Sequence, residues 1–153
     1  MDNSFLKAFF AAAALFAGCA VANAQSYEPS PVGATFVITD SQKAPWATDS
    51  FGDANARSRG LQGKTITFGA KAITAPQPMA CKKPHYERVA VEADGLFQGE
   101  LKAPDKDAAT LGFKLGKTPS LLTGCEVDYH FLDADHALFA LDNRIYRIER
   151  KKR

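Results

Sequence analysis

The chain has 153 residues, with 19 basic and 17 acidic side chains, so its formal net charge at pH 7 is only +2. A charge this small gives no indication of a nucleic-acid partner. Hydrophobic residues make up 46% of the chain and aromatic residues 10%, which is typical of a soluble globular protein rather than of a disordered one. The length suits a single domain with one core.

The first 24 residues have the pattern of an export signal. Lys7 gives a positively charged start, residues 8–21 are apolar and rich in alanine, and Ala22 and Ala24 are the small residues that a signal peptidase reads. The apolar stretch is shorter than the roughly 20 residues that a transmembrane helix needs. We therefore expect residues 1–24 to be removed, which leaves a periplasmic or secreted protein.

The same segment allows a second kind of processing. Residues 15–19 resemble the lipobox of bacterial lipoproteins, whose cysteine, here Cys19, becomes lipidated. The likeness covers residues 17–19, because Phe16 stands where lipoboxes usually carry leucine. Lipidation would tether the protein to a membrane, so an envelope lipoprotein anchored through Cys19 is one alternative to a free mature chain that starts after Ala24.

Two cysteines, Cys81 and Cys125, remain once the signal is removed. In an oxidising compartment two cysteines within one small domain normally pair. We therefore predict one disulfide, which in the chain-entropy model stabilises the fold by about 4 kcal/mol. A redox or metal-binding pair would be expected to show Cys-x-x-Cys spacing, which these two residues lack.

The start of the mature chain divides into a leader, a strand and a loop. Residues 25–33 carry two prolines and are typical of a flexible leader, followed by a single domain over residues 34–153. Residues 35–39 alternate between polar and apolar side chains and predict a strand. The polar stretch between Thr39 and Gly63 has no sustained apolar period and predicts a long loop.

The middle of the chain predicts short strands and one helix. Residues 104–111 predict the helix, because Pro104 suits a first helical position and Gly112 suits its end. Strands are predicted, on alternation and intervening turn residues, at residues 64–68, 70–74, 85–92, 95–101 and 121–125.

The last third predicts a three-stranded antiparallel meander. Alternation marks strands at residues 127–131, 138–141 and 145–150. Asp142 and Asn143 between the last two strands tolerate the positive φ of a tight two-residue turn. The chain as a whole therefore predicts a mainly β fold: a small antiparallel barrel or curved sheet of about eight strands with one short helix.

The leader peptide, the strand count, the disulfide and the closing meander together are similar to the small lipocalin-like barrels of exported bacterial proteins. The resemblance is architectural: residues 33–35 read Gly-Ala-Thr where lipocalins carry Gly-x-Trp. The chain is also similar in size and class to exported bacterial inhibitors of proteases or lysozyme. The Ser-Gly-x-x-Tyr loop of one lysozyme-inhibitor family is absent, so the resemblance assigns no inhibitory residue.

Trp46, the only tryptophan, is the candidate ligand-binding residue. It lies in the predicted long loop, where it can serve as an aromatic platform at a barrel mouth. The alternative is a packing role, in which Trp46 closes one end of the barrel.

Several polar clusters lack the spacing that chemistry would need. Compact metal-ligand spacing is missing from the histidines and their neighbouring aspartates, so turn and edge roles explain them better and no metal or other cofactor is predicted. We find no nucleophile motif, and the sequence cannot place the glutamates as acid and base pairs. The basic C-terminus either touches an anionic envelope surface or is a solvated tail. The candidate metal set consists of His85, His130, His136, Asp128, Asp133 and Asp135. The glutamates are Glu87, Glu92, Glu100 and Glu126. The basic C-terminus consists of Arg147, Arg150, Lys151, Lys152 and Arg153.

The absence of catalytic motifs favours a binding protein of unknown ligand over an enzyme. Its partner would be a small molecule or an envelope protein, and contact with a membrane would depend on lipidation at Cys19. The alternatives are an inhibitor of an envelope or foreign hydrolase, which would use residues 41–60 or the leader, and the envelope lipoprotein described above.

Overall fold

The computed structural model describes residues 30–48 and 59–152. The predicted signal with Cys19, most of the predicted leader, and the middle of the predicted loop lie outside these residues. The described part holds eight strands and two helices of seven residues: β1 (Thr35–Lys43), β2 (Thr65–Phe68), β3 (Ile73–Thr74), β4 (Glu87–Val91), the 3₁₀ helix η1 (Ala93–Gly99), α2 (Pro104–Thr110), β5 (Thr118–Leu122), β6 (Tyr129–Phe131), β7 (His136–Leu141) and β8 (Arg144–Arg150).

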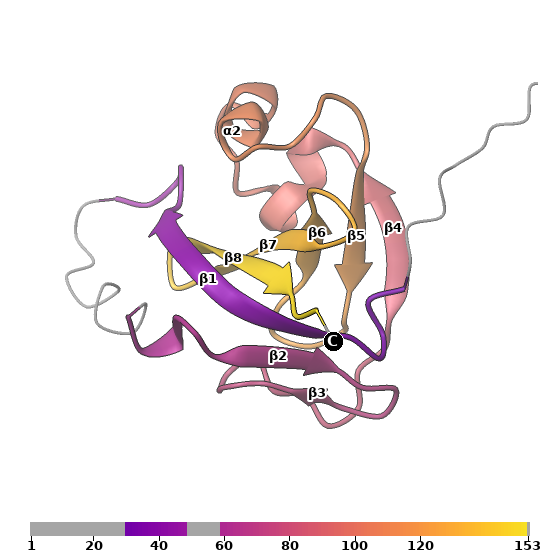
Figure 1. The fold of residues 1–153 in the computed structure, drawn as a ribbon. Coiled ribbons are helices and arrows are strands. Elements are labelled where there is room, and N and C mark those ends of the chain that lie inside the picture. Colours follow the sequence, from indigo (N-terminus) through magenta and orange to yellow (C-terminus); the bar gives the residue numbers. More distant parts are fainter. Residues whose placement is uncertain (1–29, 49–58, 153) are drawn as a thin grey trace, which may run out of the picture.

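All eight strands form one antiparallel sheet in the order β3-β2-β1-β8-β7-β6-β5-β4, which curls into a half-barrel (Figure 1). Strands that follow each other along the chain are neighbours in the sheet, with one exception: β3 and β4 do not pair. β1 also pairs with β8. This is the strand order of an up-and-down barrel that is open between β3 and β4. The predicted fold class is confirmed.

β1 is longer than the sequence pattern indicated. The strand continues to Lys43, which pairs with Arg144 of β8, so the residues that follow Thr39 are strand where a loop was predicted. The register shifts between Ile38 and Asp40 at an irregularity of the bulge type. Such a shift interrupts the alternation of side chains along the strand, which is why the polar continuation was not recognised as strand.

The interior of the curled sheet is filled by side chains. Most strands contribute, and aromatic rings dominate: Phe68 and Tyr129 meet edge to face with centroids 4.8 Å apart, and Phe139 stacks on Tyr146 at 5.0 Å. The buried members of this interior cluster are Phe36, Ile38, Leu61, Ile66, Phe68, Ile73, Met79, Leu121, Val127, Tyr129, Ala137, Phe139, Tyr146 and Ile148.

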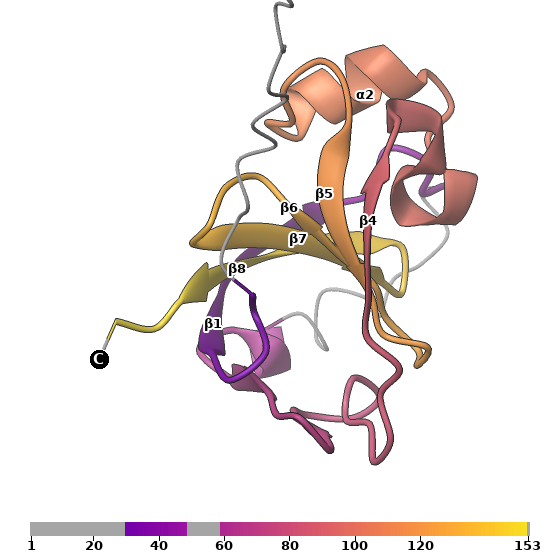
Figure 2. The same cartoon turned by 90° about the vertical axis from the view of Figure 1, so that its right-hand side faces the viewer.

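A second buried cluster covers the other face of the sheet at β7 and β8. Leu138 and Ile145 alternate with interior residues along their strands and therefore point away from the interior. η1 and α2 pack on them and lie together at one end of the molecule (Figure 2). The buried members of this outer cluster are Ala44, Leu96, Phe97, Leu101, Ala108, Leu111, Phe113, Leu138 and Ile145.

The prediction of a strand over residues 95–101 is wrong, because this segment forms most of η1. Leu96 and Phe97 are adjacent and both buried, which a strand with one covered face does not allow. The backbone turns sharply instead, and both Phe97 and Gln98 adopt the left-handed conformation with φ of 51° and 61°. Phe97 and Leu101 had suggested alternation, but Phe97 lies at the left-handed turn of η1 and Leu101 follows η1, and both are buried in the outer cluster.

The predicted helix and the last hairpin are confirmed. α2 begins at Pro104, and the Asp107 carboxylate accepts the Ala103 N–H at 2.9 Å. Asp142 and Asn143 both have positive φ, at 50° and 59°, and form the two-residue turn between β7 and β8. β5 is displaced from its predicted place and covers Thr118–Leu122, because its polar Thr118 and Ser120 are buried rather than exposed.

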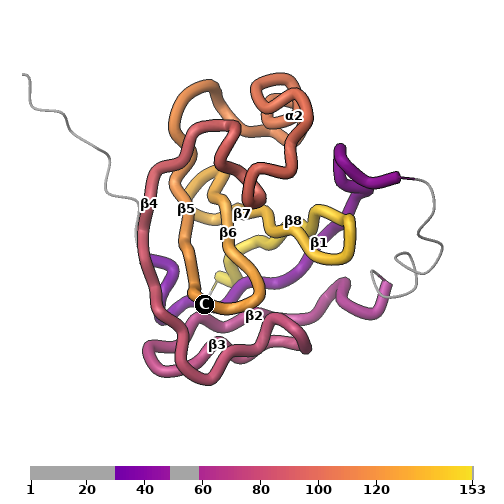
Figure 3. The backbone as a smooth tube through the Cα atoms, turned by 180° about the vertical axis from the view of Figure 1, so that it is seen from behind, coloured from indigo at the N-terminus to yellow at the C-terminus, as the bar shows by residue number. Residues whose placement is uncertain are grey.

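The predicted disulfide between Cys81 and Cys125 is present, with the two Cα atoms 6.3 Å apart. Cys81 pairs with Ile73 of β3 in an isolated bridge, and Cys125 follows β5. Seen from behind, the chain passes from β3 to β4 along the side of the molecule where β5 ends (Figure 3). The disulfide therefore joins the two flanks of the sheet across the gap between β3 and β4.

Candidate functional site

Trp46 lies just after β1, in a short turn next to the hairpin of β7 and β8. The Ala44 N–H donates to the Asn143 carbonyl at 3.0 Å, and the Ala47 N–H donates to the Ala44 carbonyl at the same distance. Ala44 is buried in the outer cluster. These contacts fix the half-buried Trp46 ring beside Phe97, with the ring centroids 5.7 Å apart.

Trp46 does not reach the interior of the half-barrel. It packs against the outer cluster, where its ring covers Phe97 and also lines a hollow of about 290 Å³. Phe97 and His130 continue this aromatic wall, with their rings edge to face at 4.7 Å. The hollow is lined by Trp46, Phe97, Gln98, Glu100, Glu126, Val127, Asp128, His130, Ala140, Leu141, Asp142 and Asn143. We call it the Trp46 hollow.

Charges around the Trp46 hollow have a single sign. Four of the described residues that line it are acidic, Glu100, Glu126, Asp128 and Asp142, and none of them is a lysine or arginine. Asp128 is held in place, because its carboxylate accepts the Thr123 N–H at 2.9 Å. In a chain whose net charge is positive, this is a local reversal of sign that favours a cation in the hollow.

His130 is the most buried polar residue of the hollow, at 3% exposed. Its Nε2 accepts the backbone N–H of Phe97 at 3.0 Å, so this nitrogen carries no proton. The proton is then on Nδ1, which donates to Ser120 Oγ at 2.7 Å, and Ser120 Oγ donates to the Thr118 carbonyl at 3.3 Å. Burial lowers the pKa of His130 to about 4, so the ring is neutral at pH 7.

Ser120 and His130 are in contact, but their geometry suits a structural role. Ser120 is 3% exposed, and its hydroxyl already donates to a backbone carbonyl. The ring nitrogen of His130 that lies away from Ser120 is used by Phe97. The pair therefore fixes η1 to the sheet, and no substrate atom has access to the serine oxygen in this arrangement.

The other histidines and aspartates of the candidate metal set are in separate places. His136 contacts the Asp133 carboxylate at 2.8 Å in the turn before β7, and Asp135 pairs with Arg150 at 3.2 Å. His85 is exposed before β4. These positions agree with the turn and edge roles that the sequence favoured. Asp128 and His130 both line the Trp46 hollow. His130 is buried on the internal strand β6, so the predicted turn or edge role is wrong for this residue.

The glutamates also separate. Glu100 and Glu126 both line the hollow although 26 positions apart, whereas Glu92 lies 3.9 Å from the exposed Lys117 and Glu87 is exposed on β4. The grouping of Glu100 and Glu126 with Trp46 was not visible in the sequence, because it depends on the left-handed turn of η1 that carries the chain toward β6.

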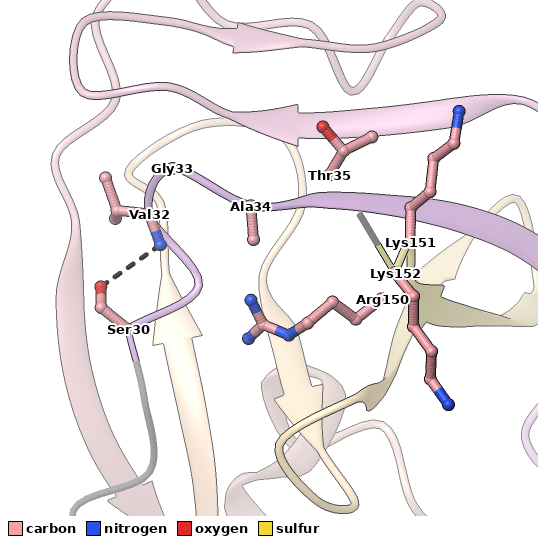
Figure 4. A pocket seen from close by; sticks show the side chains of 8 residues that line it. All are labelled: Ser30, Val32, Gly33, Ala34, Thr35, Arg150, Lys151 and Lys152. Carbon is pink, nitrogen blue, oxygen red and sulfur yellow. Dashed lines mark hydrogen bonds between the residues drawn. The ribbon is translucent and has the colours of Figure 1, made fainter.

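A larger hollow of about 740 Å³ lies between residues 30–35 and the end of β8 (Figure 4). Its basic residues do not converge on one point, since the Lys151 and Lys152 side chains extend in opposite directions. Arg150 is engaged elsewhere: its guanidinium donates to the Ala134 carbonyl, pairs with Asp135 and lies 4.9 Å from the Phe36 ring centre. These positions favour the solvated tail over an anion-binding site.

Comparison with protein-family models, with curated proteins and with solved structures found no match for this chain. Across residues 30–48 and 59–152, no helix is long and apolar enough to cross a membrane.

Proposed function

We propose that this chain is an exported binding protein without catalytic function, and that the Trp46 hollow takes a small organic cation such as an amine or a quaternary ammonium group. The observation that carries the proposal is the combination of an aromatic wall with a rim whose described charges are all negative. An aromatic face attracts a cation through its quadrupole, and most strongly where the ring is tryptophan. Neighbouring carboxylates add to the attraction.

The size of the hollow limits the ligand. Pockets for drug-sized ligands have volumes of about 300–1,000 Å³, so 290 Å³ suits a small molecule or a single basic side chain. The interior of the half-barrel is filled by aromatic and aliphatic side chains. A ligand in the barrel interior is therefore a weaker proposal than one in the hollow.

Export is part of the same proposal. The disulfide supports it, because disulfides persist in oxidising compartments and are rare in the cytosol. The predicted signal at residues 1–24 supports it from the sequence alone. The inhibitor alternative depends on residues 41–60 or on the leader, of which residues 49–58 and 25–29 lie outside the described residues. The lipoprotein alternative depends on Cys19, which also lies outside them.

Emission from Trp46 tests the proposal, because it is the only tryptophan in the chain. We would titrate the protein at pH 7.5 and low salt with choline and with its neutral carbon analogue 3,3-dimethyl-1-butanol. Choline is expected to shift or quench the emission with saturation, and the neutral analogue is expected to bind at least about threefold more weakly. An equal response to both compounds would show that the hollow does not recognise the positive charge of the ligand. No saturable response to either compound would overturn the proposed function.

Carboxylate variants give a matched control. Glu126→Gln removes one charge from the hollow, whereas Glu87→Gln removes one exposed charge on β4. Choline affinity, measured by calorimetry, is expected to fall about two- to fivefold in the first variant and to stay unchanged in the second, as a partly solvated ion pair would give. Trp46→Ala should weaken choline binding in the same assay, and Trp46→Phe should retain part of it.

A further inference from the structure

A strained segment lies under the Trp46 hollow. Phe97 and Gln98 are consecutive residues with side chains, and both adopt left-handed backbone conformations. This conformation is unfavourable for residues that carry a side chain, so the segment keeps this shape only while its surroundings hold it. Phe97 also contacts the Trp46 and Phe113 rings, so its position sets the wall of the hollow.

One of the contacts that hold the segment requires an unprotonated ring nitrogen. The Phe97 N–H needs an acceptor, and it finds one in the unprotonated Nε2 of His130. Protonation would place a hydrogen on Nε2, so that two N–H groups would face each other at the same distance. The bond to Ser120 survives protonation because Nδ1 already donates there, so the charge acts on the Phe97 contact alone.

Among the described residues, the groups packed against His130 within the fold carry no negative charge that would compensate a buried positive one. Its neighbours across the sheet are the uncharged Ser120 of β5 and the apolar Leu138 of β7, and η1 presents Phe97. Charged groups are found only on the hollow side among the described lining residues, where Glu126 and Asp128 precede β6. The remaining carboxylates of that wall are Glu100 after η1 and Asp142 in the hairpin of β7 and β8.

We propose that His130 is an acid-operated latch, whose protonation releases the Phe97 segment and opens the wall of the Trp46 hollow. This inference rests on the proposed function in so far as it regulates that same hollow, and acid would then weaken ligand binding. The direction follows from burial: the closed arrangement holds the pKa of His130 at about 4, whereas a released, solvated imidazole returns toward its ordinary value near 6.5. Between these two values each step of acid favours the open form.

The latch can be tested without any ligand. We would follow Trp46 emission of the mature chain from pH 7.5 to pH 4, with far-ultraviolet circular dichroism as a check that the sheet persists. The expected result is a reversible change of emission between pH 6.5 and pH 4. His136→Gln, which alters the accessible histidine paired with Asp133, should retain the change, whereas His130→Gln should abolish it, because a glutamine amide can accept the Phe97 N–H but does not titrate.

A change of emission that persists in His130→Gln, or a flat wild-type profile, would overturn the latch. If that variant does not fold, nitrogen-15 spectra of the wild-type histidines decide: an Nε2–H tautomer of His130 at pH 7.5, or titration with no shift of the Phe97 amide, would contradict it. The choline-binding assay tests the proposed function separately from the latch. Absence of choline binding at pH 7.5 would contradict the proposed function and not the latch. A choline affinity that is several-fold lower at pH 5 in wild type, but not in His130→Gln, would support the latch.

Discussion

At the scale of single residues, His130 shows how a polar side chain can be stabilising inside a β-sheet. Its two ring nitrogens meet one donor and one acceptor, so the neutral ring is fully hydrogen-bonded although buried. A buried polar group in this condition carries little penalty, whereas the charged form would be both desolvated and in conflict with Phe97. Protonation of His130 is therefore expected to destabilise the folded chain.

The free energy of unfolding should fall as the pH is lowered from 6.5 to 4. The unfolded chain binds a proton at His130 near pH 6.5 and the folded chain in its closed arrangement only near pH 4, so the unfolded state takes up more protons in this window. The stabilisation is complete above pH 6.5 and is lost toward pH 4, by roughly 3 kcal/mol in total. Urea unfolding at several pH values measures it. His136→Gln should show the same slope and His130→Gln a shallower one; equal slopes in these two variants would contradict the assignment.

Asn143 tests the backbone of the last hairpin. Its φ of 59° is left-handed, a conformation that glycine adopts without penalty and alanine does not. We expect Asn143→Ala to lower the free energy of unfolding by about 1 kcal/mol, and Asn143→Gly to leave it unchanged or raise it. Thermal unfolding at pH 7 distinguishes the two. If the alanine variant were as stable as the glycine variant, the two-residue turn would not have this conformation.

At the scale of elements, the short turn between β2 and β3 depends on close backbone approach. The Gly69 N–H donates to the Ala72 carbonyl at 2.9 Å, and the Gly69 carbonyl accepts the Tyr86 hydroxyl. A Cβ at position 69 would lie 2.8 Å from the Ala72 carbonyl oxygen, closer than real contacts allow. A side chain at position 69 would therefore force the backbone of this turn to move.

Gly69→Ala should destabilise the protein by about 1–3 kcal/mol, because a backbone atom cannot move aside as a flexible side chain can. Gly60→Ala is the matched control, since a Cβ there meets nothing within 4 Å and its φ is not positive. Denaturant midpoints of the two variants give the comparison. A similar loss of stability in both would mean that the turn does not constrain residue 69.

The elements that the sequence predicted are those whose signals are local. The helix at Pro104 and the hairpin at Asp142 and Asn143 are marked by residues whose backbone preferences act within a few positions. η1 was not predicted, because its buried Leu96 and Phe97 depend on packing against β7 and β8 from a distant part of the chain. Propensity carries no information about such contacts.

The candidate site was predicted only in part. Trp46 was selected for its chemistry, but its partner Phe97 and the buried His130 were not connected with it. One signal was available in the sequence. The polar Glu126, Asp128 and His130 alternate with the apolar Val127 and Tyr129, and this alternation places the three polar residues on one face of the segment. The remaining acidic residues of the hollow come from other elements and can be located only in the folded structure.

At the scale of the whole molecule, the disulfide compensates for a missing strand pair. β3 and β4 leave the half-barrel open between them, and the Cys81–Cys125 bond ties the flanks of this opening together. Its effect is largest in the unfolded chain, where the two cysteines are 44 positions apart and would otherwise move independently.

Replacing both cysteines by alanine should therefore lower the free energy of unfolding by about 4 kcal/mol, in the chain-entropy model. Guanidinium unfolding of the oxidised wild type and of Cys81→Ala/Cys125→Ala, both without reductant, measures this difference. Wild type with reductant should approach the double variant. A difference near zero would show that pairing across the open edge is held by the strands themselves.

The pairing of β1 with β8 also determines where the two ends of the described domain lie relative to Trp46. Phe36 lies opposite Arg150, and the Lys151 N–H donates to the Thr35 carbonyl, so the first and the last strand of the described domain begin and end at one pole. Trp46 lies beyond the other end of β1, about 30 Å away along a nine-residue strand. A tether attached at either terminus, whether lipid or affinity tag, would therefore join the described domain at the pole away from Trp46.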